Sequence, residues 1–298
     1  DEYWTFETPV PLIAIGPAGI ATTEIEVYFN YGDSNGTSSD KEKIYVTAID
    51  PTILEPEVAC SIDFGNSEVQ ADIVVGAATL HFERRYASQD PYIGPFGRGR
   101  THSFNIQLAK CTDGINDFVV VRRPCQQRLL FEKQPDGSYK NSLPTPYDLT
   151  EDEHGMFTIH LRDGRQFHFN ELGFVERISD ANNNATILEY EPEGKLARIA
   201  DNSQNELFLS YNERQLSVVA DHTGRQIQYS HIEGNLGSPL LETCLKGGFT
   251  TSYQYNDNEF LEAVYNDEGQ PLAQYTYNEL ERPVSKTVGQ LTISQHID

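Results

Sequence analysis

The chain has 298 residues, of which 38% are hydrophobic and 11% aromatic, with 45 acidic and 22 basic side chains. That length allows one large domain or two ordinary ones. The formal charge of −23 argues against nucleic acid or an anionic membrane surface as a partner, because both need a basic surface. No run of 18 apolar residues occurs, so no membrane span is predicted.

The beginning of the chain suggests a piece of something longer. It opens with Asp1, and its single methionine is Met156. The early apolar stretch is broken by Pro and Gly and lacks a basic flank, so it does not predict a signal peptide. We therefore expect a processed or excised part of a larger protein.

Charge is distributed unevenly. Residues 1–65 hold 12 acidic and 2 basic side chains, whereas residues 80–133 hold 5 acidic and 9 basic ones. We expect this basic island to pair with carboxylates inside the protein. Its arginines are Arg84, Arg85, Arg98, Arg100, Arg122, Arg123 and Arg128.

A small β region is predicted at the N-terminus. Residues 23–32 alternate apolar and polar side chains, residues 33–41 form a polar loop, and residues 43–49 supply a returning strand, which together predict a hairpin. The polar loop resembles a calcium loop in composition but lacks the spacing, so a solvated turn is preferred. We take residues 1–65 as an N-terminal β-rich segment that is a plug, a flap or a small domain.

From residue 157 onward the sequence repeats with a period near 21 residues, as repeat architectures do. Each period reads as an aromatic, a turn, a short apolar alternation, an aspartate and a second turn. Such a ribbon is marginal alone, so each hairpin is expected to pair with the next. The expected repeat positions are Phe169, Asp180, Tyr190, Gly194, Leu196, Asp201, Tyr211, Leu216, Asp221, Gly224, Arg225, Tyr229 and Tyr255, with Tyr275 or Tyr277 extending the series.

The stretch YNERQLSVVADHTGRQIQY (211–229) resembles the Rhs/YD-repeat family nearly position by position. A second stretch, LHFERRYASQDPYIGPFGRGRTHSFNIQL (80–108), resembles the module with which the Rhs core begins. We call residues 66–135 the lead-in module and take residues 136–298 as a connector and YD-repeat sheet. The module's expected key residues are Arg85, Tyr86, Gly94, Phe96, Gly97 and Gly99.

The resemblance implies an all-β fold in which antiparallel hairpins form a continuous, coiling sheet that is part of a hollow shell. In the bacterial members such shells enclose a C-terminal toxin, and many are exported by type VI secretion. It implies as partners the rest of the shell, the toxin domain and possible secretion-apparatus spike proteins. It also implies residence in the bacterial cytoplasm, followed by delivery to a competitor or host cell.

No constellation in the sequence predicts catalysis. The segment GPFGRGR (94–100) lacks the Lys-Ser/Thr of a phosphate loop, so a turn where strands pass closely is preferred. His154, His160 and His168 have no zinc-type spacing, so we expect strand-face roles, and the same holds for His81 and His102. We therefore expect no enzyme activity, no metal and no cofactor.

The four cysteines have no metal-binding or disulfide-framework spacing. Free buried thiols are preferred, with one disulfide possible if the protein is exported. They are Cys60, Cys111, Cys125 and Cys244.

Two functions remain open. The first is a structural module that encloses a toxin, in which the repeated tyrosines pack within the sheet. The alternative is a cell-surface adhesive or carbohydrate-binding module, in which those tyrosines would stack on sugars.

Overall fold

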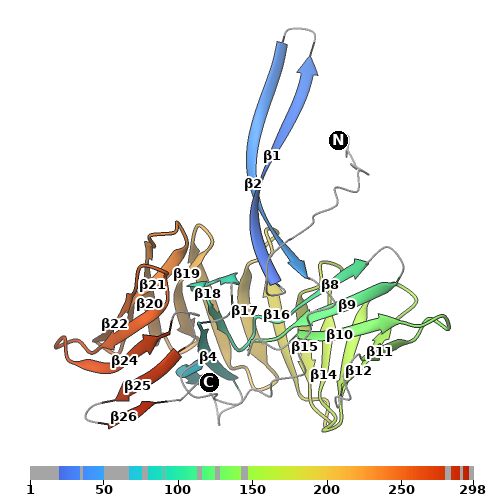
Figure 1. The fold of residues 1–298 in the computed structure, drawn as a ribbon. Helices are drawn as coiled ribbons and strands as arrows, with labels where there is room; N and C mark the ends of the chain where they lie inside the picture. Colours follow the sequence, from blue (N-terminus) through green and yellow to red (C-terminus); the bar gives the residue numbers. More distant parts are fainter. Residues whose placement is uncertain are drawn as a thin grey trace. The chain divides into compact units, whose positions relative to one another are not determined.

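The computed structural model describes residues 20–33, 36–49, 67–75, 80–88, 90, 92–112, 116–124, 128–141, 147–278, 283–288 and 291–294, with the backbone alone at 20–49, 67–69, 283 and 291–294. Every regular element among these residues is a β-strand, and every strand pairing is antiparallel. The predicted all-β fold is therefore confirmed (Figure 1). No helix in this described part is long and apolar enough to cross a membrane. The chain divides into two compact units, Asp1–Leu54 and Glu55–Asp298.

The first unit contains one long hairpin. Strand β1 (Ile20–Asp33) pairs with β2 (Gly36–Ile49), and the ladder continues until Asp33 lies opposite Gly36. The hairpin is as predicted, but the polar loop expected at 33–41 is wrong. Because a two-residue connection can close a hairpin, the polar residues after it are free to join the ladder. Cys60, in the second unit, lies outside the described residues.

The lead-in module, together with the first strand of the connector, forms two small sheets. The first has the order β3-β4-β7, and the second has the order β11-β10-β9-β8. Two short strands, β5 (Ile93–Gly94) and β6 (Gly97–Arg98), join the large repeat sheet instead. The bounds of the others are β3 Ser67–Val75, β4 Leu80–Ala87, β7 Arg100–His102, β8 Gln107–Thr112, β9 Asp117–Arg122, β10 Arg128–Lys133 and β11 Tyr139–Asn141.

The repeat sheet has 17 strands, of which β12 to β26 follow one another in chain order. In Figure 1 they run from yellow-green to red, each beside its predecessor. Their bounds are β12 Tyr147–Glu151, β13 Phe157–Leu161, β14 Gln166–Phe169, β15 Val175–Ser179, β16 Ala185–Tyr190, β17 Leu196–Asp201, β18 Glu206–Asn212, β19 Gln215–Asp221, β20 Gln226–Glu233, β21 Pro239–Lys246, β22 Phe249–Tyr255, β23 Leu261–Tyr265, β24 Pro271–Tyr277, β25 Pro283–Val288 and β26 Leu291–Ser294.

One β-bulge recurs at the same place in successive hairpins. Tyr190 lies opposite Leu196 and Glu189 opposite Arg198, so Ala197 is an extra residue. The extra residue places Leu196 and Ile199, three apart, on the same buried face. The short apolar alternation expected after each turn is therefore interrupted by one residue. The same register shift occurs at His168/Phe169, Ser210/Tyr211, Ser230/His231, Gln254/Tyr255 and Thr276/Tyr277.

These shifts correct the predicted series of repeat aromatics. His231, and not Tyr229, occupies the bulge position in β20, opposite Leu241. Tyr277, and not Tyr275, continues the series in β24. Sequence spacing missed this because β20 and β21 extend further towards their shared turn than the neighbouring pairs do. We call the residues that face the bulges at these six shifts the ladder positions: Phe169, Tyr190, Tyr211, His231, Tyr255 and Tyr277.

A single buried apolar cluster includes side chains of both the lead-in module and the repeat sheet. In β18, for example, Leu207 and Leu209 are buried, whereas Phe208 between them is 40% exposed. One face of the repeat sheet therefore packs on the lead-in module, and the other is more polar. The lead-in module supplies Phe82, Phe96, Val121 and Phe131 to the centre of this cluster.

Candidate functional site

A buried arginine, Arg84, lies where the lead-in module contacts the repeat sheet. The alternation of buried and less buried side chains along β4 places it there. Leu80, Phe82, Arg84 and Tyr86 share the buried face of this strand. Arg84 thus takes a position where an apolar side chain is expected. A buried guanidinium is tolerable only when its N–H groups find acceptors.

Arg84 has acceptors for all of its nitrogens. Its Nε and Nη2 donate to the Asp72 carboxylate, the Nη2–Oδ1 distance being 3.0 Å, and Nη2 also donates to Gln70. Its Nη1 donates to the Tyr253 hydroxyl at 2.9 Å. Tyr229 donates its hydroxyl proton to Asp72 at 2.6 Å. The repeat sheet and the lead-in module therefore share one buried ion pair.

The charges in this cluster shift the pKa values of its members. Burial alone would lower the pKa of Arg84, but Tyr253 and the Asp72 carboxylate raise it well above its ordinary value. Burial first, and then Asp72, raise the pKa of Tyr229. The cluster therefore holds Arg84 charged and Tyr229 protonated across the physiological range.

Arg100 makes a second set of contacts between the lead-in module and the repeat sheet. Its guanidinium carbon lies 4.6 Å from the Tyr86 ring centroid and 4.5 Å from that of Tyr253. Its Nε donates to the Tyr255 hydroxyl at 3.1 Å. The Leu261 N–H donates to the Tyr86 hydroxyl at 2.9 Å, and burial raises the pKa of Tyr86 to about 12. We call Asp72, Arg84, Tyr86, Arg100, Tyr229, Tyr253 and Tyr255 the junction cluster.

The glycines at 94–99 allow the backbones to approach closely, as predicted. A Cβ at Gly97 would lie 2.0 Å from the carbonyl oxygen of Pro239, and φ is +89°. A Cβ at Gly94 would lie 2.1 Å from the Arg100 carbonyl oxygen, and one at Gly99 would lie 2.6 Å from that of Ala87. The neighbouring Phe96 is fully buried, with its ring 4.8 Å from that of Tyr229.

All four tyrosines at the ladder positions form the same hydrogen bond. Tyr190, Tyr211, Tyr255 and Tyr277 donate their hydroxyls to the carbonyls of Val175, Leu196, Leu241 and Leu261, at 2.7, 3.1, 2.9 and 2.7 Å. Each acceptor lies 14 to 16 residues earlier, in the hairpin before. The ladder therefore ties each hairpin to its predecessor through a side chain as well as through the sheet.

His231 interrupts this series. Its Nε2 is buried and has no hydrogen-bond partner among the described residues. Burial, and then the charge of Arg100, lower its pKa to about 4. Tyr229, which sequence spacing assigned to the ladder, instead reaches Asp72 in the junction cluster.

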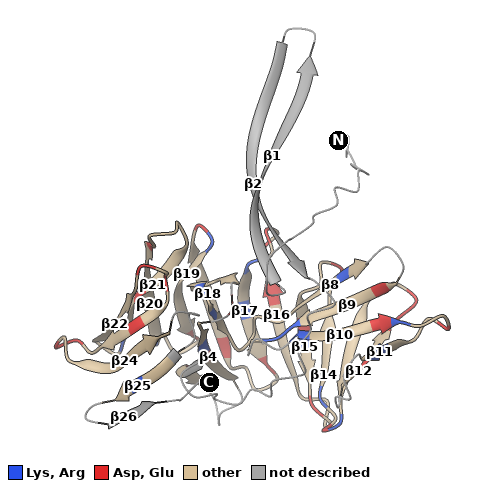
Figure 2. Cartoon of the chain, in the orientation of Figure 1, with Lys and Arg blue, Asp and Glu red and all other residues tan. Residues whose placement is uncertain are grey.

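The repeated aspartates begin tight turns. The Oδ1 of Asp221 accepts the N–H groups of Thr223 and Arg225, while its Oδ2 accepts from the Arg225 guanidinium. Asp180 and Asp201 accept in the same i+2 and i+4 pattern. Burial would raise the pKa of Asp221, but these bonds lower it. Figure 2 shows charged residues at many of these turns.

The fourth residue of these turns needs a positive φ, which glycine adopts most easily. Gly194 and Gly224 supply it at +81° and +87°. Asn183, Gln204 and Glu259 stand in the same place in turns without glycine, at +63°, +63° and +64°. Glycine is therefore not obligatory there, and sequence spacing missed these positions.

Glu259 uses its strained position to connect neighbouring turns. Its Oε1 accepts the N–H of Leu236 at 2.7 Å, and its Oε2 lies 3.4 Å from Nη1 of Arg98. Burial would raise its pKa, but the bonds from Ser238 and Leu236 lower it. The carboxylate thus joins two turns of the repeat sheet to the lead-in module. No motif in the sequence marks it.

Other expected site residues lie outside the junction cluster. Arg85 lies on the opposite face of β4, 2.8 Å from Glu83. His160 and His168 bond to threonines on neighbouring strands at 3.0 and 3.1 Å, as expected for strand-face residues. His154 lies in an exposed turn, and His102 is fully buried between aromatic rings.

Cys244 and Cys111 are free thiols, and burial raises the pKa of Cys244 to about 11. Cys244 is buried as expected, whereas Cys111 is only half-buried. Cys125, like Cys60, lies outside the described residues.

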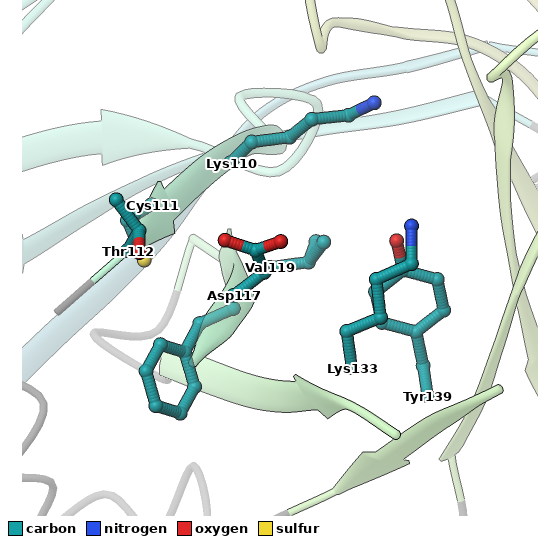
Figure 3. A pocket seen from close by; sticks show the side chains of 8 residues that line it. Lys110, Cys111, Thr112, Asp117, Val119, Lys133 and Tyr139 are labelled. Atoms are coloured by element: carbon teal, nitrogen blue, oxygen red, sulfur yellow. The ribbon is translucent and has the colours of Figure 1, made fainter. Parts of the chain in front are cut away.

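A shallow pocket of about 280 Å³ lies at the end of β8 to β11. Figure 3 shows Lys110, Asp117, Lys133 and Tyr139 around it. Both lysines pair with Glu151, at 3.0 and 3.3 Å, and so are already neutralised. Among the described residues, no group of three His, Cys, Asp or Glu side chains is placed to hold a metal ion.

Comparison with known proteins gives limited matches. A family model described as "Domain of unknown function (DUF6531)" matches residues 66–131. None of the curated proteins matches the chain. Similar solved structures are those of TcdB2-TccC3 without its hypervariable C-terminal region, of TcdB2-TccC3-Cdc42 and of TcdB2-TccC3-TEV.

The structural matches are distant. Their sequence identities are 12%, 13% and 12%, and their TM-scores are 0.36, 0.34 and 0.36. They cover 64%, 69% and 89% of this chain but only 11%, 12% and 15% of those chains.

The contacts of the junction cluster give it a structural role, which is to hold the lead-in module on the repeat sheet. Arg84 is paired with Asp72, the tyrosine hydroxyls are hydrogen-bonded, and the aromatic rings lie against the guanidiniums of Arg84 and Arg100. Such an arrangement fixes the position of one part of the chain on another.

Proposed function

We propose that this chain is the N-terminal part of an Rhs-type β-shell, which encloses and protects a C-terminal toxin domain and has no enzyme activity of its own. The observation that carries the proposal is the strand order. Strands β12 to β26 add one hairpin after another to a single antiparallel sheet. Such a sheet is a wall that can grow by repetition, with only neighbours in contact.

The hydrogen bonds of the repeated side chains support this structural role. The ladder tyrosines donate to backbone carbonyls and the repeated aspartates accept from turn N–H groups, so both kinds of residue serve the sheet. The junction cluster fixes the lead-in module on one face. The Rhs/YD pattern of residues 211–229 and 80–108 points the same way.

The wider setting belongs to the same proposal. The shell is completed by further hairpins of the longer protein, and its cargo is the toxin domain. The protein resides in the bacterial cytoplasm until export, by type VI secretion or a related spike-bearing apparatus, and is then delivered to a competitor or host cell.

Limited proteolysis of the full-length protein tests this function. We expect the C-terminal domain to resist a protease that rapidly degrades the same domain expressed alone. Arg84→Ala, which breaks the junction cluster, should make the enclosed domain sensitive. Arg162→Ala, in an exposed turn of the repeat sheet, is the matched control. Equal digestion of the enclosed and isolated domains would exclude enclosure.

A glycan array tests the adhesive alternative with the same protein. Specific glycan binding that is lost in Tyr211→Ala, with the fold intact, would support that alternative instead.

A further inference from the structure

A second buried arginine in the lead-in module differs from Arg84 in its partners. Arg122, at the end of β9, is only 9% exposed. Among the described residues its Nη1 and Nη2 atoms are buried and have no hydrogen-bond acceptor. Arg84, buried in the same module, has acceptors for every nitrogen.

The surroundings of Arg122 add positive charge. Arg128 lies directly opposite it in the β9–β10 ladder. Asp90 accepts from Arg128, with an Nη2–Oδ1 distance of 3.3 Å and both side chains less than a tenth exposed. Arg128 therefore has a carboxylate partner, whereas the two Nη atoms of Arg122 have no hydrogen-bond partner among the described residues.

The neighbouring titratable groups respond to that charge. Burial lowers the pKa of Arg128, Asp90 opposes the shift, and Arg122 adds to it. Burial, and then Arg122, lower the pKa of His102 to about 3, so this imidazole is neutral at physiological pH. A buried charge without a counter-charge is costly, because desolvation is not repaid.

The edge of the Arg122 guanidinium that carries Nη1 and Nη2 is buried and lacks an acceptor among the described residues. One face of Arg122 is stacked on Tyr92, with 3.2 Å between the guanidinium carbon and the ring centroid. The Tyr92 ring is itself held by a bond from Asn105 Nδ2 to its hydroxyl at 3.0 Å. The stacked plane presents Nη1 and Nη2 side by side, which is the fork that carboxylates and phosphates accept in bidentate fashion.

We propose that Arg122 is the anchor of an oxyanion-binding site, which accepts a carboxylate or a phosphate-type group on its two Nη nitrogens, with Arg128 adding to the positive field. The oxyanion is either a free inorganic anion or the carboxylate of an acidic peptide segment. The site is independent of the proposed shell function.

Thermal unfolding of the full chain tests the proposal. The protein is compared in chloride, phosphate and sulfate, and with a short glutamate-rich peptide, all at matched ionic strength. We expect at least one oxyanion to raise the midpoint temperature above the chloride value in a saturable manner. Stabilisation by phosphate and sulfate indicates a free anion, whereas stabilisation by the peptide alone indicates a protein carboxylate.

Variants locate the effect. Arg122→Met should abolish the response to the oxyanion and unfold in chloride at or above the temperature of the wild type, because an unpaired buried charge has been replaced by an apolar side chain. Arg162→Met, in an exposed turn, should respond like the wild type.

Two outcomes overturn the proposal: no oxyanion stabilises the wild type beyond chloride, or the response is the same in Arg122→Met. If Arg122→Met does not fold, calorimetric titration of the wild type with phosphate, sulfate and the peptide decides the question. The absence of saturable heat with all three contradicts the site.

Discussion

At the scale of single residues, this protein buries charge where its parts meet. Arg84 and Asp72 are 2% and 3% exposed and lie in a core that is otherwise apolar and aromatic. An ion pair of this kind contributes little net stability but is costly to break, since the remaining partner stays buried. The ion pair therefore favours one position of the lead-in module on the repeat sheet over other positions.

Arg84→Ala is predicted to destabilise the second unit strongly. The change leaves the Asp72 carboxylate buried without its cation, so we expect a loss of about 3–5 kcal/mol in the free energy of unfolding. Urea unfolding followed by tyrosine fluorescence measures it. Arg85→Ala, on the opposite face of β4, is the matched control and should cost under about 1 kcal/mol, as partly exposed ion pairs do. Similar losses in both variants would contradict the role of the junction cluster.

His231 is predicted to make stability depend on pH. Its pKa is lowered to about 4 in the folded protein, while the unfolded chain takes up the proton near pH 6.5. The folding free energy contributed by the neutral His231 imidazole is therefore complete above pH 6.5 and is lost as the pH falls towards 4.

Urea unfolding at pH 7 and pH 5 checks this dependence. His231→Asn should lose less stability between these two pH values than the wild type, whereas His154→Asn, in an exposed turn, should behave like the wild type. An unchanged slope in His231→Asn would disprove the assignment.

At the scale of elements, the repeating unit of the sheet is a hairpin, and the same β-bulge marks successive hairpins. The bulge brings a ladder tyrosine opposite the first buried residue of the next strand, and its hydroxyl reaches the preceding hairpin. Packing, backbone ladder and side-chain hydrogen bond therefore act on the same pair of neighbours. Such units contribute to stability as a sum of nearest-neighbour terms.

Tyr211→Phe is predicted to cost about 0.5–1.5 kcal/mol, the net contribution of one hydrogen bond. The ring is kept, so the change removes only the bond to the Leu196 carbonyl. Tyr265→Phe is the matched control, because its hydroxyl bonds to Gln254 at the exposed surface. Thermal unfolding should separate the two variants, and equal behaviour would argue against the ladder.

Gly97→Ala is predicted to disturb the contact between β6 and β21. A Cβ there would meet the backbone of Pro239 and Leu240, and the positive φ adds strain. Gly269→Ala has a similar φ of +75° but open space around it, so it should cost only about 1 kcal/mol. Hydrogen exchange at Leu240 and Leu241 should rise in the first variant alone; if it rises in both, the close approach is not the cause.

At the scale of the whole molecule, a wall made of hairpins has ends. In the described part of the chain, β12 stands at one end of the repeat sheet. Unpaired strand edges are templates for pairing with another chain. The proposed shell would cover such edges with the remainder of the protein.

The chain of residues 1–298 is accordingly predicted to self-associate as its concentration rises. Sedimentation velocity over a range of concentrations measures this. Small-angle scattering should report an open particle, larger than a closed globule of the same mass. A compact monomer at all concentrations would contradict the proposed partial wall.

The sequence was sufficient for the strand class, the repeat and the close-packed glycines, because these follow from local spacing and turn chemistry. It was insufficient for Asp72 and Glu259, whose roles depend on contacts with residues far along the chain. It placed Tyr229 in the ladder, since the pattern of aromatics does not reveal that β20 and β21 extend further towards their shared turn than the neighbouring pairs do. The arginine island was anticipated as a set, but only geometry separates the satisfied Arg84 from Arg122.

The ladder also has a consequence for how such genes diverge. Successive ladder positions are 21, 21, 20, 24 and 22 residues apart, yet each keeps the same register with the next strand. The length differences are absorbed at the turns and, in β20 and β21, between the bulge and the tip of the hairpin. We therefore expect insertions and deletions to be tolerated better at hairpin tips than beside a bulge, so that the period of the sequence can drift while the architecture persists.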